Sequence, residues 1–501
     1  MRSGLGLLLG AWMGLAPALA AEPPPVVTTP AGALRGTVED GVRVFRGIPY
    51  AAPPVGALRW RAPQPAQPWE GVRDASRSGP ACLQKMAAQE PERSLKDGPQ
   101  GEDCLTLNIW LPPQAEGPLP VMVWIHGGSF RFGAGSLALY DGAHLARQGV
   151  AVVTLNYRLG LFGTFAHPAL AEPGEPGGNY GLLDAIAALR WVRENIAAFG
   201  GDPGTVTLFG ESAGGVSVGY LMASPLARGL FHRAIMQSGG LDLPEYDRPQ
   251  AEAVAQRLAT AWGAADAAAL RALPATALRD APTSAAETMP FLDGAVVPAR
   301  ARDAFEAGQA APVPLLTGSN DAEAGFFPPP FWRGLPAELG AERWAKLRPL
   351  CFGHGAASED ACAGQLASER FAGVNNRRLM RGAAAHAPAT APVYAYRFAW
   401  VPPAARGTVP GAIHTAEIPY VFGHVAADPA ADAASRALSR DLSARWVAFA
   451  RSGQPGPGWP AFRPGGEEHL LLITPEGTAP GANPAAALLD GLAALSLPAK
   501  P

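Results

Sequence analysis

The chain has 501 residues, of which 48% are hydrophobic and 17% charged, with a formal net charge of −3. This composition is typical of a globular protein with a large core, and heavy use of Ala, Gly and Pro indicates loop-rich connections more than disorder. A near-neutral charge without a run of basic residues gives no electrostatic basis for nucleic-acid binding. The length exceeds the usual domain of about 100–200 residues, so several domains or one α/β sheet with insertions are both possible.

The N-terminus has the pattern of a secretory signal peptide. It carries one basic residue, a short apolar stretch, and small residues at Ala18 and Ala20. This order predicts a signal peptide over residues 1–20 with cleavage after Ala20, and a membrane anchor is the alternative. No later stretch approaches the ~18 consecutive apolar residues that span a bilayer. We therefore expect an exported, soluble mature protein, periplasmic or extracellular.

The chain has four cysteines, which lie in two close pairs along the sequence. Their spacing predicts the disulfides Cys82–Cys104 and Cys351–Cys362, although three connectivities are formally possible and four buried thiols are the alternative. Export would place the chain in oxidising conditions, where such bridges persist. There is no C-x-x-C pair and no H-E-x-x-H pattern, so we expect no metal and no cofactor.

Short apolar runs alternate with helical patterns along most of the chain. Continuous runs of this kind suit strands that are buried on both faces of a mostly parallel sheet. Their alternation with helices predicts an open α/β architecture. An Ala-rich helical stretch at about 244–310 is expected to be an insertion that caps the sheet. The expected strands are 105–111, 121–128, 150–157, 205–210, 233–239, 312–320 and 392–398, and the clearest helices are 179–201 and 435–453.

Two glycine-bearing turns carry the chemistry. Residues 210–214 read G-E-S-A-G between an expected strand and an expected helix, which is the context of a nucleophilic serine at Ser212. Residues 126–129 read H-G-G-S at the end of another strand, where successive backbone N–H groups can point at one oxyanion. Ordinary strand-to-loop turns are the alternative at both places.

Several ordered stretches resemble the type-B carboxylesterases of the α/β-hydrolase superfamily, which include bacterial para-nitrobenzyl esterases and the cholinesterases. The matching stretches cover most of the mature chain and include "FRGIPYAAPPVGALRWRAPQP", "EDCLTLNIWLP", "VWIHGGSF", "LNYRLGLFG", "FGESAGG", "AIMQSGG", "GSNDAEAGFF" and "GAIHTAEIPYVFG". The resemblance implies an α/β-hydrolase fold, a central mostly parallel sheet flanked by helices with helical cap insertions. Residues 21–501 would then form one domain with its insertion at about 244–310.

The resemblance also implies a catalytic triad of Ser212, Glu323 and His414. The order Ser, then Glu, then His along the chain agrees independently with that of an α/β-hydrolase. The acid segment departs from the common D-E-G pattern, because alanines flank Glu323 on both sides. Asp321 is therefore a second candidate for the acid.

The resemblance assigns the oxyanion hole to the backbone N–H groups of Gly128, Ser129 and Ala213. The turn departs from the common H-G-G-G because Ser129 takes the place of the last glycine. A backbone donor tolerates this if the dihedral angles suit a residue with a Cβ. Glu211, beside the serine, resembles a buried acid of the family. We expect it to have a structural role or to contact the reacting groups without transferring a proton itself.

The expected function is hydrolysis of carboxylic esters through an acyl-enzyme, with a small-molecule ester as the partner and no cofactor. Between Cys82 and Cys104 there is no Trp, Tyr or Phe, so a choline-ester specialist is disfavoured. Small to medium, or xenobiotic, esters are the expected substrates. A lipase for longer acyl chains and a catalytically silent binding module are the alternatives. The aromatic residues that could line an acyl or alcohol pocket, or simply pack in the core, are Phe130, Phe326, Phe327 and Trp332.

Overall fold

The structure is a computed structural model that describes residues 24–85, 99–241 and 246–495. The predicted signal peptide, residues 1–20, lies outside these ranges. Among the described residues, no helix is long and apolar enough to cross a membrane.

Within the described ranges, eleven strands form one large sheet. The strands from β15 to β10 run parallel to their neighbours, while β16, β8, β4 and β3 are antiparallel, so the expected mostly parallel sheet is confirmed. In sheet order the strands are β16 (Gly477–Ala482), β15 (His469–Thr474), β14 (Val393–Phe398), β13 (Leu315–Asn320), β12 (Arg233–Gln237), β11 (Gly201–Glu211), β9 (Leu119–Ile125), β10 (Ala151–Leu155), β8 (Thr106–Leu111), β4 (Val42–Pro49) and β3 (Thr37–Glu39). Outside this sheet lie β1 (Val26–Thr29), β2 (Gly32–Arg35) and β5 (Val72–Asp74) in one small sheet, and β6 (Ala81–Cys82) with β7 (Gln100–Gly101) in another.

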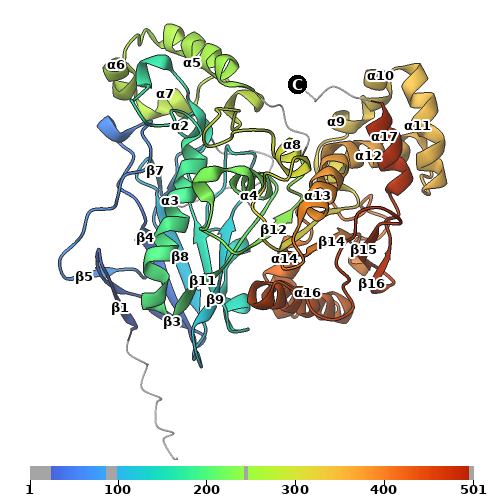
Figure 1. The fold of residues 1–501 in the computed structure, drawn as a ribbon, viewed down its shortest axis with the longest axis horizontal. Helices are drawn as coiled ribbons and strands as arrows, with labels where there is room; N and C mark the ends of the chain where they lie inside the picture. The colour runs from blue at the N-terminus through green and yellow to red at the C-terminus, as the bar shows by residue number, and fades with distance from the viewer. Residues whose placement is uncertain (1–23, 86–98, 242–245, 496–501) are drawn as a thin grey trace, which may run out of the picture.

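The central strands are largely apolar and buried because helices cover both faces of the sheet (Figure 1). In β9, Val121 and Val123 join the core on one face, while Met122 and Trp124 join the core on the other. Side chains alternate across a strand, so a strand that is buried on both sides needs a continuous apolar run. The first face is covered by α2 (Gly160–Thr164), α3 (Tyr180–Asn195), α4 (Ala213–Ala223), α8 (Ala301–Glu306) and α13 (Val374–His386), and the second by α1 (Ala143–Ala146), α14 (Ile418–Val421), α15 (His424–Ala427) and α16 (Ala433–Ser452).

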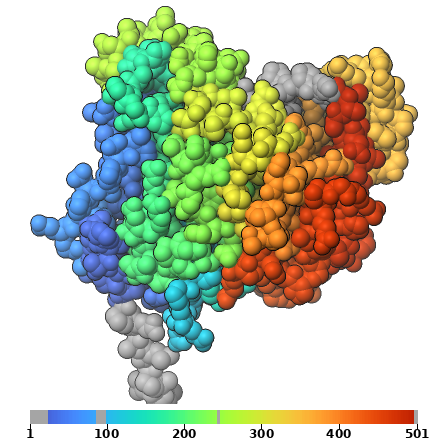
Figure 2. Space-filling model, viewed as in Figure 1, coloured from blue at the N-terminus to red at the C-terminus, as the bar shows by residue number. Residues whose placement is uncertain are grey.

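Two further groups of helices stand at one end of the molecule. Figures 1 and 2 show that the two groups project separately from the molecule, at the upper left and the upper right. The first group belongs to the stretch expected as an insertion, whose boundaries stay a prediction, and the second packs around its own small apolar cluster. The first contains α5 (Arg248–Trp262), α6 (Ala267–Ala272) and α7 (Ala275–Arg279), and the second contains α9 (Pro330–Arg333), α10 (Leu335–Leu339), α11 (Ala341–Gly353), α12 (Glu359–Ser368) and α17 (Ala486–Ala494).

The cysteines pair as their spacing predicts. Cys82 and Cys104 have Cα atoms 4.9 Å apart and Cys351 and Cys362 have Cα atoms 5.3 Å apart, both with their sulfurs at disulfide distance. The first pair fastens the segment of β6 to the residues just before β8. The second pair joins α11 to α12.

Candidate active site

Ser212 lies in a sharp turn between β11 and α4. Its backbone adopts φ 57° and ψ −126°, a strained conformation for a residue with a side chain, and its N–H donates to Gln237 O at 3.0 Å. The side chain is 8% exposed. A Cβ at Gly214 would collide with the carbonyl oxygen of Ile125 on β9, so the last glycine of the motif is required by close backbone approach. The structure thus places Ser212 in the strand–turn–helix context expected for the motif.

Glu323 and His414 meet beside this turn. Glu323 opens a short turn after β13, and His414 lies in the connection between β14 and α14. The Glu323 Oε2 atom lies 2.5 Å from His414 Nδ1. The other carboxyl oxygen, Oε1, accepts from the Ser238 hydroxyl at 2.6 Å and from the Asn320 N–H at 2.8 Å. Because both oxygens are occupied and both side chains are almost fully buried, the carboxyl group holds the imidazole in one orientation.

Asp321, the second candidate for the acid, faces the backbone instead of the imidazole. Its Oδ1 atom accepts from the Ala412 N–H at 2.7 Å. Burial raises the pKa of Asp321 to about 6, against the opposing attraction of Arg397. The two acids therefore have different positions, since Glu323 contacts the ring of His414 and Asp321 contacts the loop that leads to it.

The opposite edge of the imidazole faces the serine turn. His414 Nε2 lies 3.3 Å from Oε1 of Glu211, the residue directly before Ser212. A Cβ built on Gly127 would lie 3.1 Å from the Cβ of Ser212, so the glycine turn after β9 packs against the serine. The structure brings the serine turn, the imidazole and the glycine turn together at the carboxyl edge of the parallel sheet, where open α/β sheets bind ligands.

The glycine turn holds unusual backbone angles. Gly128 has φ 107° and Ser129 has φ 54°, and the second value lies in the left-handed region that residues with a Cβ can enter. The Gly128 carbonyl accepts from the N–H groups of Arg131 at 2.9 Å and Phe132 at 3.1 Å, which fixes the turn. In the described part of the chain, the N–H groups of Gly128, Ser129 and Ala213 donate to no protein acceptor. Two of these amides lie in the turn that packs against Ser212, and the third belongs to the residue that follows it.

Gln84 braces this turn and was not predicted. Its side-chain oxygen accepts from the Gly133 N–H at 2.8 Å, and its side-chain nitrogen donates to the carbonyls of Gly133 and Cys82, both at 2.9 Å. The amide thereby ties the disulfide segment to the far end of the glycine turn. A glutamine in an unpatterned loop carries no sequence signal for such a role.

His126, the first residue of the glycine turn, is held by two hydrogen bonds. Its Nδ1–H donates to Gly127 O at 2.7 Å, and the Tyr157 hydroxyl donates to the His126 carbonyl at 2.9 Å. Burial lowers the pKa of His126 to about 4, so the ring stays neutral at physiological pH. These two hydrogen bonds help to fix the glycine turn.

A second buried acid lies close to Glu323. Glu417 accepts from the side chains of Asn320 at 2.8 Å and Gln237 at 3.0 Å. Burial, and then the neighbouring Glu323, raise the pKa of Glu417. Glu417, three residues after His414, and Ser238 each lie within a stretch that resembles the family. The resemblance could therefore have drawn attention to both residues, but it implied no role for either.

Aromatic rings form one side of the space next to His414. The rings of Phe326 and Phe371 meet the imidazole edge-on, with centroids 5.5 and 5.7 Å away, and Phe327 packs against both phenylalanines. These side chains are partly exposed, whereas Phe130 is buried in the main core. Trp332 packs against the small cluster of the second helix group. Of the four candidate pocket aromatics, Phe326 and Phe327 thus lie near the imidazole.

Nothing in the described ranges gathers three or more His, Cys, Asp or Glu side chains into a group that could hold a metal ion. The groups assembled at the carboxyl edge are a serine, an imidazole, carboxyl groups and backbone amides. That set can activate a hydroxyl and stabilise an oxyanion.

Comparison with known proteins gives the family. The carboxylesterase family matches residues 23–337 and 357–486. The chain is 38% identical over 483 residues to fumonisin B1 esterase of Sphingopyxis macrogoltabida, covering 89% of this chain and 86% of that protein. It is 38% identical over 490 residues to para-nitrobenzyl esterase of Bacillus subtilis, covering 89% and 94%, and 37% identical over 491 residues to phenmedipham hydrolase of Pseudarthrobacter oxydans, covering 90% and 96%.

Solved structures agree. A para-nitrobenzyl esterase superposes with a TM-score of 0.79 at 35% identity, and a thermophilic one with 0.80 at 35%, each match covering 93% of this chain and 99% of the other. The expected α/β-hydrolase fold is confirmed by these likenesses and by the large mixed sheet between helices. The chain belongs to the carboxylesterase family and is a carboxylic ester hydrolase.

Proposed function

We propose that the protein is an exported serine carboxylesterase that works through an acyl-enzyme on Ser212. The observation that carries the proposal is the 2.5 Å contact between Glu323 and His414 next to the strained serine turn. His414 takes the proton of Ser212, and the hydroxyl oxygen attacks the ester carbonyl. Glu323 orients the imidazole and stabilises the imidazolium that forms.

The oxyanion of the tetrahedral intermediate is held by the N–H groups of Gly128, Ser129 and Ala213. His414 then gives its proton to the leaving alcohol. A water molecule repeats the sequence on the acyl-enzyme and releases the acid. Glu211, beside His414 Nε2, adds an acidic group on the side where the imidazolium carries its proton.

Small to medium, or xenobiotic, esters are the proposed substrates. The relatives' names, a para-nitrobenzyl esterase, a phenmedipham hydrolase and a fumonisin B1 esterase, are consistent with synthetic or unusual esters. The two disulfides are compatible with export through the predicted signal peptide.

The test is hydrolysis of para-nitrophenyl esters with acyl chains of two to sixteen carbons by the wild type and Ser212→Ala. We expect cleavage of the short chains and loss of activity in the variant. A preference for the longest chains would favour a lipase. A wild type no more active than Ser212→Ala, with both folded, would overturn the proposal and favour a silent binding module.

A further inference from the structure

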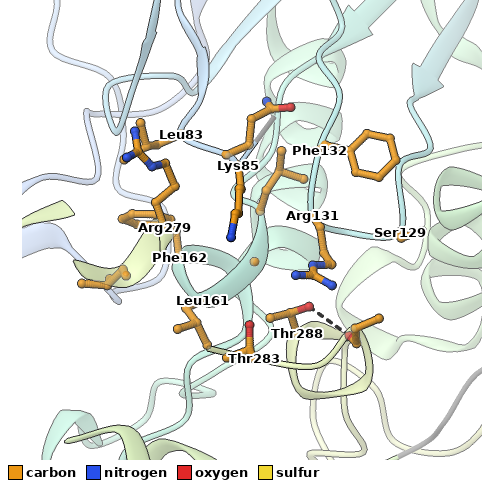
Figure 3. Close-up of a pocket in the computed structure, with 15 residues that line it drawn as sticks. Leu83, Lys85, Ser129, Arg131, Phe132, Leu161, Phe162, Arg279, Thr283 and Thr288 are labelled. Atoms are coloured by element: carbon orange, nitrogen blue, oxygen red, sulfur yellow. Dashed lines mark hydrogen bonds between the residues drawn. The ribbon is translucent and has the colours of Figure 1, made fainter. Parts of the chain in front are cut away.

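A pocket of about 300 Å³ opens beside the glycine turn (Figure 3). Its walls come from four parts of the chain, namely the segment after Cys82, the turn after β9, residues 159–162 at the start of α2, and the end of α7 with the loop that follows it. Ser129, one of the proposed oxyanion donors, and Gln84, which braces the same turn, both line it. The size is at the lower end of the range for small-molecule sites. The pocket therefore adjoins the place where an ester carbonyl would lie.

The charged side chains that line this pocket are basic. They are Lys85, Arg131 and Arg279, and no Asp or Glu occurs among the described lining residues. Figure 3 shows the ammonium group of Lys85 and the guanidinium group of Arg131 entering the same hollow from different segments. Neither side chain makes an ion pair with another described residue, whereas buried arginines such as Arg158 and Arg397 do.

Arg279 differs from the other two cations. It makes a two-point contact with Asp280, Nε to Oδ1 at 2.9 Å and Nη2 to Oδ2 at 2.7 Å. Hydrogen bonding to Arg279, and more weakly the charge of Lys85, lowers the pKa of Asp280, which therefore stays ionised near neutral pH. Three cations thus face one carboxylate among the described residues, and the pocket keeps a positive charge.

The remaining walls strengthen the attraction for an anion. Leu83, Phe132, Leu161, Phe162 and Leu278 supply apolar surface around the two free cations. Low-dielectric walls reduce the screening of charge and focus the field into a cleft. Thr283 also lines the pocket, and Figure 3 shows its hydroxyl on the side below Lys85. Two cations, a hydroxyl and apolar walls form a suitable site for a carboxylate at the end of a short hydrocarbon chain.

We propose that this pocket, the anion pocket, binds a carboxylate carried by the ester substrate, and that the enzyme prefers half-esters and other anionic esters to neutral ones of the same size. The inference rests on the proposed function, because Ser129 joins the anion pocket to the oxyanion hole. The carboxylate is held by Lys85 and Arg131 while the ester carbonyl lies against the glycine turn.

The test compares matched substrates in a pH-stat. Monoethyl adipate against ethyl hexanoate places the charge on the acyl side, and 4-acetoxybutanoate against butyl acetate places it on the alcohol side. We expect kcat/KM of the anionic member to exceed that of the neutral member in at least one pair. Lys85→Met and Arg131→Met should each lower this ratio about three- to tenfold, mainly through KM of the anionic ester.

The ratio of kcat/KM for the anionic ester to kcat/KM for the neutral ester distinguishes loss of carboxylate binding from damage to the glycine turn. A disturbed turn lowers kcat/KM equally for both members of a pair and leaves the ratio unchanged. Arg193→Met, which removes an exposed cation on α3, is the matched control and should leave the ratios unchanged. Neutral esters cleaved at least as well as anionic ones in both pairs would overturn the inference while the proposed function stands. An anionic preference that survives Lys85→Met/Arg131→Met would also overturn it. If no ester is cleaved above the Ser212→Ala background, it is the proposed function that fails.

Discussion

Replacing Asp321 with asparagine removes a carboxyl group whose pKa the fold raises to about 6. An aspartate in an unfolded chain has a pKa of about 3.9. Below that pH the group is protonated in both states. Between the two values the folded state keeps a proton that the unfolded state has released, so the free energy of unfolding falls as the pH rises through this window. Above pH 6 the folded chain carries a buried carboxylate at a cost.

The magnitude follows from the difference between the two pKa values. A rise of about two units corresponds to about 3 kcal/mol between the low-pH and high-pH limits. Over the practical interval from pH 4.5 to pH 8, the change is about 2 kcal/mol. Asparagine keeps an oxygen that can accept from the Ala412 N–H, the bond that Asp321 makes at 2.7 Å. The variant should therefore gain stability over the wild type at pH 8, by about 2 kcal/mol more than at pH 4.5.

Urea unfolding followed by tryptophan fluorescence measures this difference for both proteins at both pH values. The same preparations should hydrolyse para-nitrophenyl acetate at rates close to each other, because Asp321 faces the backbone and not the imidazole. A stability difference that does not depend on pH would refute the electrostatic argument. A loss of stability at pH 8 would show that the attraction between Asp321 and Arg397 outweighs burial. A large loss of kcat would indicate instead that Asp321 is the acid that acts with His414.

Other substitutions address the site directly. Glu323→Gln should lower kcat about 10²–10⁴-fold with a smaller change in KM, since the imidazole loses the group that fixes its tautomer, and steady-state kinetics checks this. Ser238→Ala should lower kcat about tenfold and shift the pH–rate profile, because it removes the hydroxyl that donates to Glu323 at 2.6 Å. Gln84→Ala should lower kcat about ten- to hundredfold by freeing the end of the glycine turn, and an unchanged kcat would show that the brace is dispensable. Serine at both Cys82 and Cys104, 22 residues apart, should cost about 3 kcal/mol in urea unfolding.

The sheet could be predicted from the sequence because its signals are local. Runs such as 121–128 and 150–157 begin with at least four consecutive apolar residues, and the structure places β9 and β10 there with both faces buried. The helix expected over 179–201 is found as α3 with a further turn, ending at Gly200 with φ 89°. Glycine is needed there because a left-handed residue closes the helix.

The residues around the site could be predicted only in part. Ser212 and the glycine turn lie in short motifs, in which a few consecutive residues determine both the backbone geometry and the chemistry. Such motifs can be recognised in the sequence alone. Gln84 and Ser238 act through side-chain hydrogen bonds to segments far away in the chain, and no spacing rule reports such contacts. The helices α10 and α11 were also missed, since their apolar residues pack on one small cluster and give weak periodicity.

The groups expected to react with the ester and the groups expected to select it come from different kinds of segment. The reacting groups follow the ends of β9, β11, β13 and β14, where buried hydrogen bonds fix them on a rigid sheet. Lys85 and Arg131 come from connections outside the strands, and together with Arg279 at the end of α7 they supply the charge of the anion pocket. Loops on a rigid scaffold change without loss of the fold, so proteins that share this fold can select different esters. Exchange of Lys85 and Arg131 should therefore alter which ester is preferred, whereas exchange of Glu323 should slow the hydrolysis of every ester.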